Sequence, residues 1–353
     1  MSNNHCALCG REIDDPASAI VGITGQAVCT ACLGISQKMS TPEKPKQTIS
    51  GVLTPQEMIR ELDKSIIGQD KAKRAIAVAL WKQQLRANGD DSVPRTNLLL
   101  CGPTGCGKTA LVREGARIAN LPFICFDATT LSEAGYRGCD ARDIVKELCR
   151  RYEDHPHLSN GIIFLDEFDK LAAQGGETRV SYNRGTQHSL LKLIEGDEVE
   201  GLSTDALLFI FGGAFMELTA PKTPARPIGF EQEPAESKVN ELSVTDFVGY
   251  GMEPELMGRV GQYIRLDELT ADDLRKILLE SRLSLFRQYQ SFFHRRGIEL
   301  HLTRQCIDEI LESSLALGTG ARGLNTVVER AVEPLLFRLA SGELKGRVML
   351  RAG

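Results

Sequence analysis

Long hydrophobic runs are absent from this sequence of 353 residues. No apolar stretch approaches the roughly 20 residues that a helix needs to cross a bilayer, so we expect no membrane-spanning segment. The amino-terminal residues are polar and lead directly into a cysteine motif, which is not the pattern of a secretory signal. These two absences predict a cytoplasmic protein without a membrane partner.

An excess of positive charge is also missing. The 42 lysines and arginines are outnumbered by 47 aspartates and glutamates, and the formal net charge is −5. Dedicated nucleic-acid-binding proteins are usually basic, so this balance disfavours that class. We find no internal repeats, and the length exceeds what one core usually serves, so two or three domains are expected.

The ten cysteines do not resemble a disulfide framework, because six are scattered through apolar or nucleotide-site segments. The other four form two CxxC pairs separated by residues 10–28. They are Cys6, Cys9, Cys29 and Cys32. Four thiolates at this spacing suit one tetrahedral zinc ion and leave no open coordination position, so the ion is predicted to be structural. Disulfide-bonded or simply buried cysteines are the alternative, and the adjacent His5 is expected on the surface.

Composition divides the chain before residue 56. Residues 1–35 form the cysteine-rich module, and residues 36–55 are rich in proline, serine, lysine and threonine, which predicts a flexible linker. Short apolar runs then alternate with helical segments such as 109–120, the pattern of a parallel β-sheet covered on both faces. The runs of strand length lie at 97–101, 123–128, 161–166 and 206–211. Four prolines in residues 218–240 predict a long mobile loop.

A second domain is expected to begin near Thr270. This residue suits a helix N-cap, acidic residues follow in the first turn, and apolar positions then keep approximate helical spacing as far as Tyr289. A short strand near 298–302 and two further helices complete the region. The predicted fold is therefore α/β, with a large parallel-sheet domain over residues 56–268 and a smaller, mainly helical domain over residues 269–353.

Residues 102–109 match the phosphate-binding pattern GxxxxGK(S/T) in full. The match follows a predicted strand and begins a predicted helix, which is the context of a P-loop. The glycines let backbone N–H groups surround phosphate, Lys108 reaches the β- and γ-phosphates, and Thr109 binds Mg²⁺. A glycine-rich turn is the alternative, and Cys106 is expected to be a small filler. The predicted nucleotide contacts are Gly102, Pro103, Thr104, Gly105, Cys106, Gly107, Lys108 and Thr109.

An apolar run that ends in two acids, Asp166 and Glu167, predicts the other half of this site. In a P-loop fold the carboxyl end of such a strand faces the phosphates. Asp166 is then predicted to hold Mg²⁺, and Glu167 to orient and polarise the water that attacks ATP. A solvated strand edge or a helix cap is the alternative for an isolated acidic pair.

Taken together, the motifs resemble those of the ClpX branch of AAA+ proteins over nearly the whole chain. The cysteine spacing is similar to that of the family's zinc domain, and Ile66 and Ile67 lie in a segment that resembles one packed beside adenine. The matching segments are residues 66–73, 127–138 (first pore loop), 190–196, 211–215, 253–259 (arginine finger) and 320–324 (sensor 2). Many NTPases share a P-loop, whereas this combination is far more specific.

The resemblance implies a homo-hexameric ring with each ATP site between two subunits, and ATP, Mg²⁺ and Zn²⁺ as cofactors. Arg259 would contact a neighbour's γ-phosphate, and Arg322 would sense nucleotide and couple hydrolysis to domain rotation. Tyr136 would grip an extended polypeptide in a central channel. A surface salt bridge is the alternative for each arginine, and a surface or partly buried position for Tyr136. One tripeptide resembles the family's docking segment for the peptidase ClpP, and it is Ile228, Gly229 and Phe230.

Three features depart from the family pattern. Arg137 follows Tyr136 where a small aliphatic residue is usual, which predicts a ring of positive charge at the substrate grip. The stretch 196–206 is short and lacks an insertion whose basic loop helps to recognise a degradation tag. Asn325 stands where the family has a second arginine in the sensor-2 helix. We therefore predict a specialised member with dedicated substrates, and the zinc module as a dock for adaptors.

These expectations converge on an ATP-dependent unfoldase that delivers unfolded or tagged proteins to a ClpP-type peptidase, since the sequence contains no protease constellation of its own. A remodelling chaperone without a peptidase is the main alternative. A nucleic-acid motor is disfavoured by the acidic balance. A scaffold that binds nucleotide without turnover is disfavoured because every catalytic candidate is present. These candidates are Lys108, Asp166, Glu167, Arg259 and Arg322.

Overall fold

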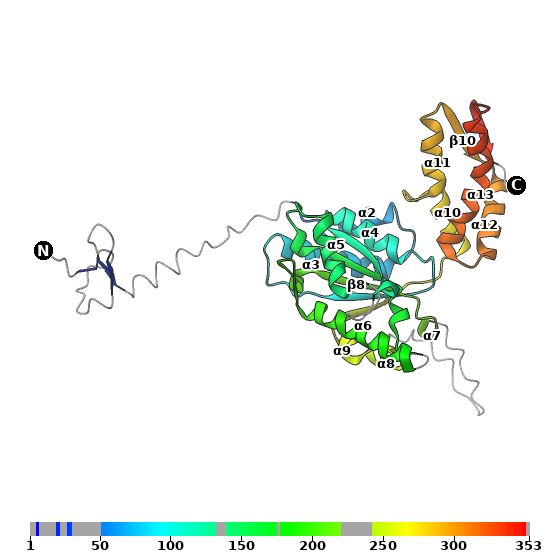
Figure 1. Ribbon diagram of the computed structural model, residues 1–353. Helices are drawn as coiled ribbons and strands as arrows, with labels where there is room; N and C mark the ends of the chain where they lie inside the picture. The colour runs from blue at the N-terminus through cyan, green and yellow to red at the C-terminus, as the bar shows by residue number, and fades with distance from the viewer. Residues whose placement is uncertain are drawn as a thin grey trace, which may run out of the picture. The chain divides into compact units, whose positions relative to one another are not determined.

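Two separate units make up the chain, residues 1–50 and residues 51–353. The computed structural model (Figure 1) describes residues 5–6, 19–21, 27–29, 51–131, 139–174, 177–219 and 242–350. Within these ranges, no helix has both the length and the apolar character needed to cross a membrane.

The first unit is described at residues 5–6 and at a short two-stranded ribbon. β1 (Ala19–Val21) pairs antiparallel with β2 (Ala27–Cys29). Cys6 is buried and His5 is exposed, as the sequence predicts for His5. Of the four predicted zinc ligands, Cys9 and Cys32 lie outside the described residues.

A five-stranded parallel β-sheet forms the centre of the larger unit, with the spatial order β4-β5-β8-β3-β9. Its strands are β3 (Asn97–Cys101), β4 (Phe123–Asp127), β5 (Ile162–Asp166), β8 (Leu208–Gly213) and β9 (Val260–Arg265). The sequence predicts the first four close to these bounds. It does not predict β9, because the exposed Gly261 and Gln262 interrupt the apolar pattern of this edge strand.

Helices cover both faces of this sheet, and each face has its own hydrophobic core. The helices of the first face are α2 (Pro55–Asp63), α3 (Asp70–Ala87) and α4 (Lys108–Ala119). Those of the second face are α5 (Ala141–Arg151), α6 (Glu177–Glu195), α8 (Val244–Tyr250) and α9 (Pro254–Gly258). Figure 1 shows α6, α8 and α9 across the sheet from α2 and α4. Leu98 and Leu100 of β3 join the first core and Leu99 the second, so the strand is apolar throughout. The predicted α/β fold is confirmed.

Between α6 and β8 the chain forms a tight hairpin. β6 (Glu198–Val199) pairs antiparallel with β7 (Leu202–Ser203), and the connecting Glu200 and Gly201 have φ values of 53° and 79°. Two residues with positive φ are the preferred connection of a two-residue hairpin. This hairpin lies within the short stretch 196–206. After β8 follows α7 (Met216–Thr219), and residues 220–241, which include most of the predicted long loop, lie outside the described residues.

The C-terminal region is mainly helical and has a third hydrophobic core, formed by residues between Leu269 and Leu350. Its elements are α10 (Ala271–Leu279), α11 (Leu285–His294), β10 (Ile298–Leu302), α12 (Arg304–Ala316), α13 (Gly320–Ala340) and β11 (Gly346–Leu350). Thr270 caps α10 as predicted, because its hydroxyl accepts the Asp273 N–H at 3.2 Å. β10 is the predicted short strand, and β11, which the sequence does not predict, pairs with it in parallel.

The predicted helical spacing after the cap is interrupted once. α10 ends at Leu279 and α11 begins only at Leu285. Ser281 leaves the helical path and donates its hydroxyl hydrogen bond to the carbonyl of Ser65, far away in the sequence. Ser284 then caps α11. Serine side chains that bond backbone groups compete with helix continuation, which is why apolar spacing alone misses this break.

Candidate nucleotide-binding site

The P-loop connects the end of β3 to the start of α4, at the carboxyl edge of the parallel sheet. The Gly102 N–H donates to the carbonyl of Gly213 at the end of β8 (3.2 Å). Gly105 and Gly107 have φ values of 78° and 102°, a region that residues with side chains rarely adopt. The loop therefore curls tightly ahead of a helix N-terminus, the arrangement that binds anions through backbone N–H groups.

Lys108 is the first residue of α4, and only 8% of its surface is exposed. Its ammonium group donates to the carbonyl oxygens of Gly102 (2.7 Å) and Pro103 (3.0 Å). A buried cation requires such acceptors. The amine thus lies inside the curl of the loop, where phosphate oxygens would take over from the two carbonyls.

Thr109 and Asp166 meet at the same edge of the sheet. The Thr109 hydroxyl donates to Asp166 Oδ2 at 2.6 Å. Asp166 is the last residue of β5 and stands in register with Asp127, the last residue of β4. Hydroxyl and carboxylate oxygens are the hard ligands that Mg²⁺ prefers. The residues present therefore fit a magnesium ion held beside the phosphates.

Glu167 has a different environment from the acid before it. Its φ of 55° lies in the left-handed region, which is uncommon for residues other than glycine and concentrates at functional sites. Its N–H donates to Asp166 Oδ1 at 3.0 Å, and the residue is exposed. One acid is thus bonded to Thr109, and the other is exposed.

Ile66 and Ile67, predicted beside adenine, lie in the connection between α2 and α3, where Ile66 is buried and Ile67 half-buried. The next anchored residue is Gln69, whose amide donates to the carbonyls of Cys106 (3.4 Å) and Asp267 (2.8 Å). The same amide accepts the Asp267 N–H at 3.0 Å. Sequence reasoning assigns Gln69 no role, because a bond between residues 198 positions apart leaves no local pattern.

The N-terminus of α13 lies directly against the P-loop. The Ala321 N–H donates to the Gly105 carbonyl at 3.0 Å, and a Cβ added to Gly105 would lie 2.0 Å from the carbonyl oxygen of Thr319. Arg322 stands in the first turn of α13 and is exposed. Within the described part of the chain, its guanidinium has no hydrogen bond or ion pair. The C-terminal region thus places one uncommitted arginine beside the phosphate-binding loop.

Arg259 lies apart from this cluster. It directly precedes β9, whose Val260 is in register with Asn97, the first residue of β3. The P-loop follows the opposite end of β3, about 13 Å further along at ~3.3 Å per residue. The Arg259 guanidinium forms an exposed ion pair with Glu195 at the end of α6. At this distance the side chain cannot reach the P-loop of the same chain.

Two cysteines lie beside the phosphate-binding loop. Burial raises the pKa of both the Cys101 and the Cys106 thiols, against the opposing effect of the Lys108 charge. Cys106 is 3% exposed. A buried thiol with a raised pKa is a poor nucleophile. This environment agrees with the filler role predicted for Cys106.

Some predicted site residues lie outside the described residues. They are Tyr136, Arg137, Ile228, Gly229 and Phe230, besides Cys9 and Cys32. The chain on either side of the predicted pore loop is described, and a β-bridge there joins Leu131 to Cys139.

Two protein-family models match the chain. The family described as "AAA domain (Cdc48 subfamily)" matches residues 93–263, which include the P-loop, Asp166 and Glu167. The family described as "C-terminal, D2-small domain, of ClpB protein" matches residues 269–348. Together the two matches cover the sheet and the C-terminal helical region.

The chain is also similar to full-length relatives. It is 33% identical to the ATP-dependent Clp protease ATP-binding subunit ClpX of Treponema denticola, over 97% of this chain and 91% of that protein. For ClpX of Azotobacter vinelandii the identity is 35%, over 95% and 86%. For ClpX 2 of Wolinella succinogenes it is 33%, over 100% and 96%.

Proposed function

The chain belongs to the ClpX family of AAA ATPases, and from this premise we propose that it is an ATP-dependent protein unfoldase of the cytoplasm. The observation that carries the proposal is the convergence of Lys108, Thr109 and Asp166 at one edge of the sheet. Lys108 would hold the β- and γ-phosphates, while Thr109 and Asp166 would hold Mg²⁺. Glu167 would activate the attacking water. Mg²⁺ supplies charge neutralisation on the phosphates when bound.

The unfoldase activity can be tested even though the natural substrate is unidentified. A Glu167→Gln variant that binds ATP but does not hydrolyse it should retain client proteins, which mass spectrometry identifies. A captured client is then mixed with the wild-type protein. The proposal expects ATP-dependent loss of the client's native fluorescence, with none in ADP. Clients that remain folded through many ATP turnovers would contradict it.

We further propose that the ATP site is completed by Arg259 of a neighbouring subunit in a homo-hexamer. Support comes from the position of Arg259, at the opposite end of β3 from the P-loop. Arg259 cannot act on the ATP of its own subunit, but its guanidinium has the chemistry of an arginine finger. This combination fits a head-to-tail ring, in which each Arg259 faces the neighbouring ATP site. Arg322, beside the P-loop on α13, would link the state of the nucleotide to movement of the C-terminal region.

Tyr136 would grip the polypeptide in the central channel of such a ring, with Arg137 beside it. A Tyr136→Ala variant should hydrolyse ATP but unfold clients slowly, since an aromatic side chain provides most of a nonspecific polypeptide grip. An Arg137→Glu variant should shift client choice away from acidic segments. Unchanged unfolding in both variants would contradict the channel role.

A ClpP-type peptidase is the proposed partner, because apolar Ile228 and Phe230 lie in a polar, proline-rich segment. Co-purification of this protein with a ClpP heptamer from the same organism should be lost on Phe230→Ala. The matched Phe337→Ala variant changes a phenylalanine that is 74% exposed on α13 and should retain the partner. Clients that are unfolded but never degraded would instead favour a peptidase-independent remodelling chaperone.

The proposal of a zinc module is based on the spacing of the four cysteines and on the burial of Cys6. Because thiolate ligands select zinc, the purified protein should contain one zinc ion per chain. A Cys29→Ser variant should lose the ion. The Cys149→Ser variant, which changes a cysteine of α5, is the matched control and should keep it. Zinc-free wild-type protein purified without chelator would contradict this site.

A further inference from the structure

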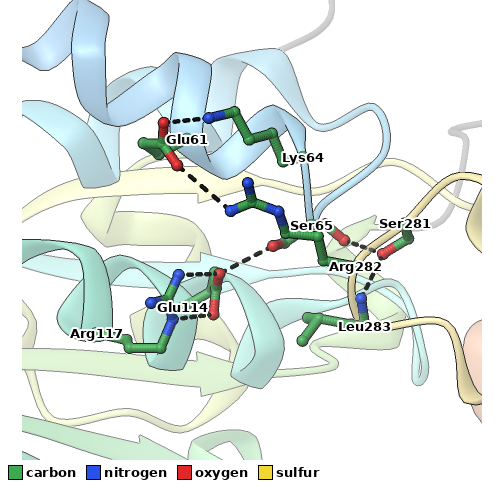
Figure 2. A network of polar contacts seen from close by, with 8 residues as sticks. All are labelled: Glu61, Lys64, Ser65, Glu114, Arg117, Ser281, Arg282 and Leu283. Atoms are coloured by element: carbon green, nitrogen blue, oxygen red, sulfur yellow. Dashed lines mark hydrogen bonds and ion pairs between the residues drawn. The ribbon is translucent and has the colours of Figure 1, made fainter. Parts of the chain in front are cut away.

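Ser65 lies where three parts of the molecule meet (Figure 2). It follows α2 and directly precedes Ile66 and Ile67, the residues predicted to lie beside adenine. Only 3% of its surface is exposed. A buried serine has one hydroxyl and two backbone groups to satisfy, and the partners of these groups show what holds the base-contacting segment in place.

The hydroxyl of Ser65 holds the segment to the P-loop helix. It donates to Glu114 Oε1, on α4, at 2.9 Å. Arg117 donates two further hydrogen bonds to the same carboxylate, at 2.9 and 2.7 Å. Hydrogen bonds to an ionised group are stronger than neutral ones. The helix is itself firmly seated, because a Cβ on Gly115 would lie only 2.7 Å from a methyl carbon of Leu80 on α3.

The backbone around Ser65 is bonded to the C-terminal region. The Ser281 hydroxyl donates to the Ser65 carbonyl, and the Arg282 N–H donates to the Lys64 carbonyl at 2.9 Å. The Leu283 N–H in turn donates to the Ser281 oxygen at 3.1 Å, which fixes that hydroxyl. Ser281 is 1% exposed. Figure 2 shows Ser281, in the break between α10 and α11, bonded to both Ser65 and Leu283.

The other end of the segment is anchored independently. Gln69 exchanges two hydrogen bonds with the backbone of Asp267, just before the C-terminal region begins. The two isoleucines therefore lie between one anchor at Ser65 and another at Gln69. Of the two, only the Ser65 anchor bonds residues inside the C-terminal helical region.

We propose that Ser65 is a positioning residue for the base of the bound nucleotide, and this rests on the proposed ATP-dependent function. Its hydroxyl fixes Ile66 and Ile67 relative to the P-loop helix. Its carbonyl makes the position of the same residues depend on Ser281. Loss of the Ser281 bond alone should loosen the base contact and leave the phosphate contact of the P-loop in place, because the separate bond from Ala321 to Gly105 is unchanged. Nucleotide exchange is thereby coupled to the C-terminal region through the base.

The test compares ATP with inorganic tripolyphosphate, which has the phosphates but no base. Binding of each to full-length protein is measured by calorimetry with Mg²⁺ for Ser65→Ala and Ser281→Ala. The control is Ser314→Ala, which removes an equally buried hydroxyl that donates within α12 to Ile310 at 2.5 Å. Loss of one hydrogen bond predicts ATP affinity about 3- to 10-fold weaker in both test variants. The affinity of both test variants for tripolyphosphate should stay within about twofold of the wild-type value. The affinity of the control variant for both ligands should also stay within this range.

The outcomes separate this inference from the proposed function. Equal weakening of both ligands would overturn it, because Ser65 would then support the P-loop as a whole. Unchanged ATP affinity in either test variant would overturn it as well. Ser281→Ala leaves the Ser65 side chain intact. If Ser65→Ala does not fold, the ATP and tripolyphosphate affinities of Ser281→Ala therefore test the inference. A wild-type protein that binds tripolyphosphate but not ATP would overturn the proposed function itself.

Discussion

Two adjacent acids, Asp166 and Glu167, have different environments because the backbone turns left-handed between them. Asp166 accepts the Thr109 hydroxyl, whereas Glu167, with φ of 55°, is exposed and donates its N–H to Asp166. The strained residue, Glu167, is the one proposed to activate the attacking water. Strain at this position is consistent with a fixed catalytic geometry.

Replacement of that second acid should separate binding from turnover. Glu167→Gln keeps the shape of the side chain but removes the base, so ATP affinity should change little while turnover falls about 10²- to 10⁴-fold. Steady-state phosphate release and ATP binding measure the two effects. Glu153→Gln, at an exposed acid after α5, is the control and should have the wild-type rate. Equal losses in affinity and turnover would refute the assignment.

The contact of Gly105 with α13 can be tested by comparison with Gly201. The two glycines have nearly the same φ, but only Gly105 has a close neighbour. A Cβ on Gly105 would lie 2.0 Å from the Thr319 carbonyl, and one on Gly201 meets nothing within 4 Å. Gly201→Ala should cost about 1–2 kcal/mol of unfolding free energy from the backbone alone. Gly105→Ala should cost more and should weaken ATP binding, since α13 must move off the P-loop. Equal unfolding free energies in urea would argue against this contact.

What the sequence reveals about individual site residues depends on how local the signal is. Lys108, Thr109 and Asp166 stand in short motifs whose spacing encodes their chemistry. Gln69 lies in the matching segment 66–73 and Ser65 just before it, but that segment does not reveal their partners, which lie elsewhere in the chain. Buried polar side chains that bond distant segments are the residues that motif reasoning misses.

At the scale of elements, predictability follows the continuity of the apolar run, which the edge strand β4 also has. β3, β5 and β8 are covered on both faces and read as continuous apolar runs, so their positions are evident in the sequence. β9 is an edge strand with exposed positions and gives no such run. The break between α10 and α11 is hidden for a different reason, since serines at 281 and 284 leave the apolar spacing nearly intact.

The contact of α4 with the α2–α3 connection should depend on pH. Hydrogen bonds from Arg117, and then from Ser65, hold the pKa of Glu114 below its ordinary value of 4.5. The ionised form is therefore favoured in the folded state, and its stabilisation is complete above about pH 4.5 and lost as pH falls through the lower folded-state pKa. Glu114→Gln should flatten the decline of unfolding free energy between about pH 5 and 3.

Urea denaturation across this pH range measures that slope. The control is Glu153→Gln, which changes an exposed acid after α5. A solvent-exposed carboxylate contributes little to the free energy of unfolding, so this variant should keep nearly the wild-type slope. Identical slopes for wild type and Glu114→Gln would show that the buried carboxylate does not titrate as argued.

For the whole molecule, the position of Arg259 is the decisive feature. Its ion pair with Glu195 lies at the opposite end of β3 from the P-loop, so no single subunit contains a complete site in the proposed ring. Within one subunit, the sheet domain and the C-terminal region meet at the nucleotide site through the bond from Ala321 to Gly105 and the bond from Ser281 to Ser65. In the proposed ring, hydrolysis would require a second copy of the chain.

The most direct measurement of this claim is the ATP turnover of mixed assemblies. Arg259→Ala and Glu167→Gln should each reduce turnover by about 10²-fold or more. In an equal mixture, some Arg259→Ala subunits receive an intact arginine from a Glu167→Gln neighbour. If sites act independently, turnover recovers to about a quarter of the wild-type rate. A mixture no faster than its two separate components would contradict a site shared between subunits.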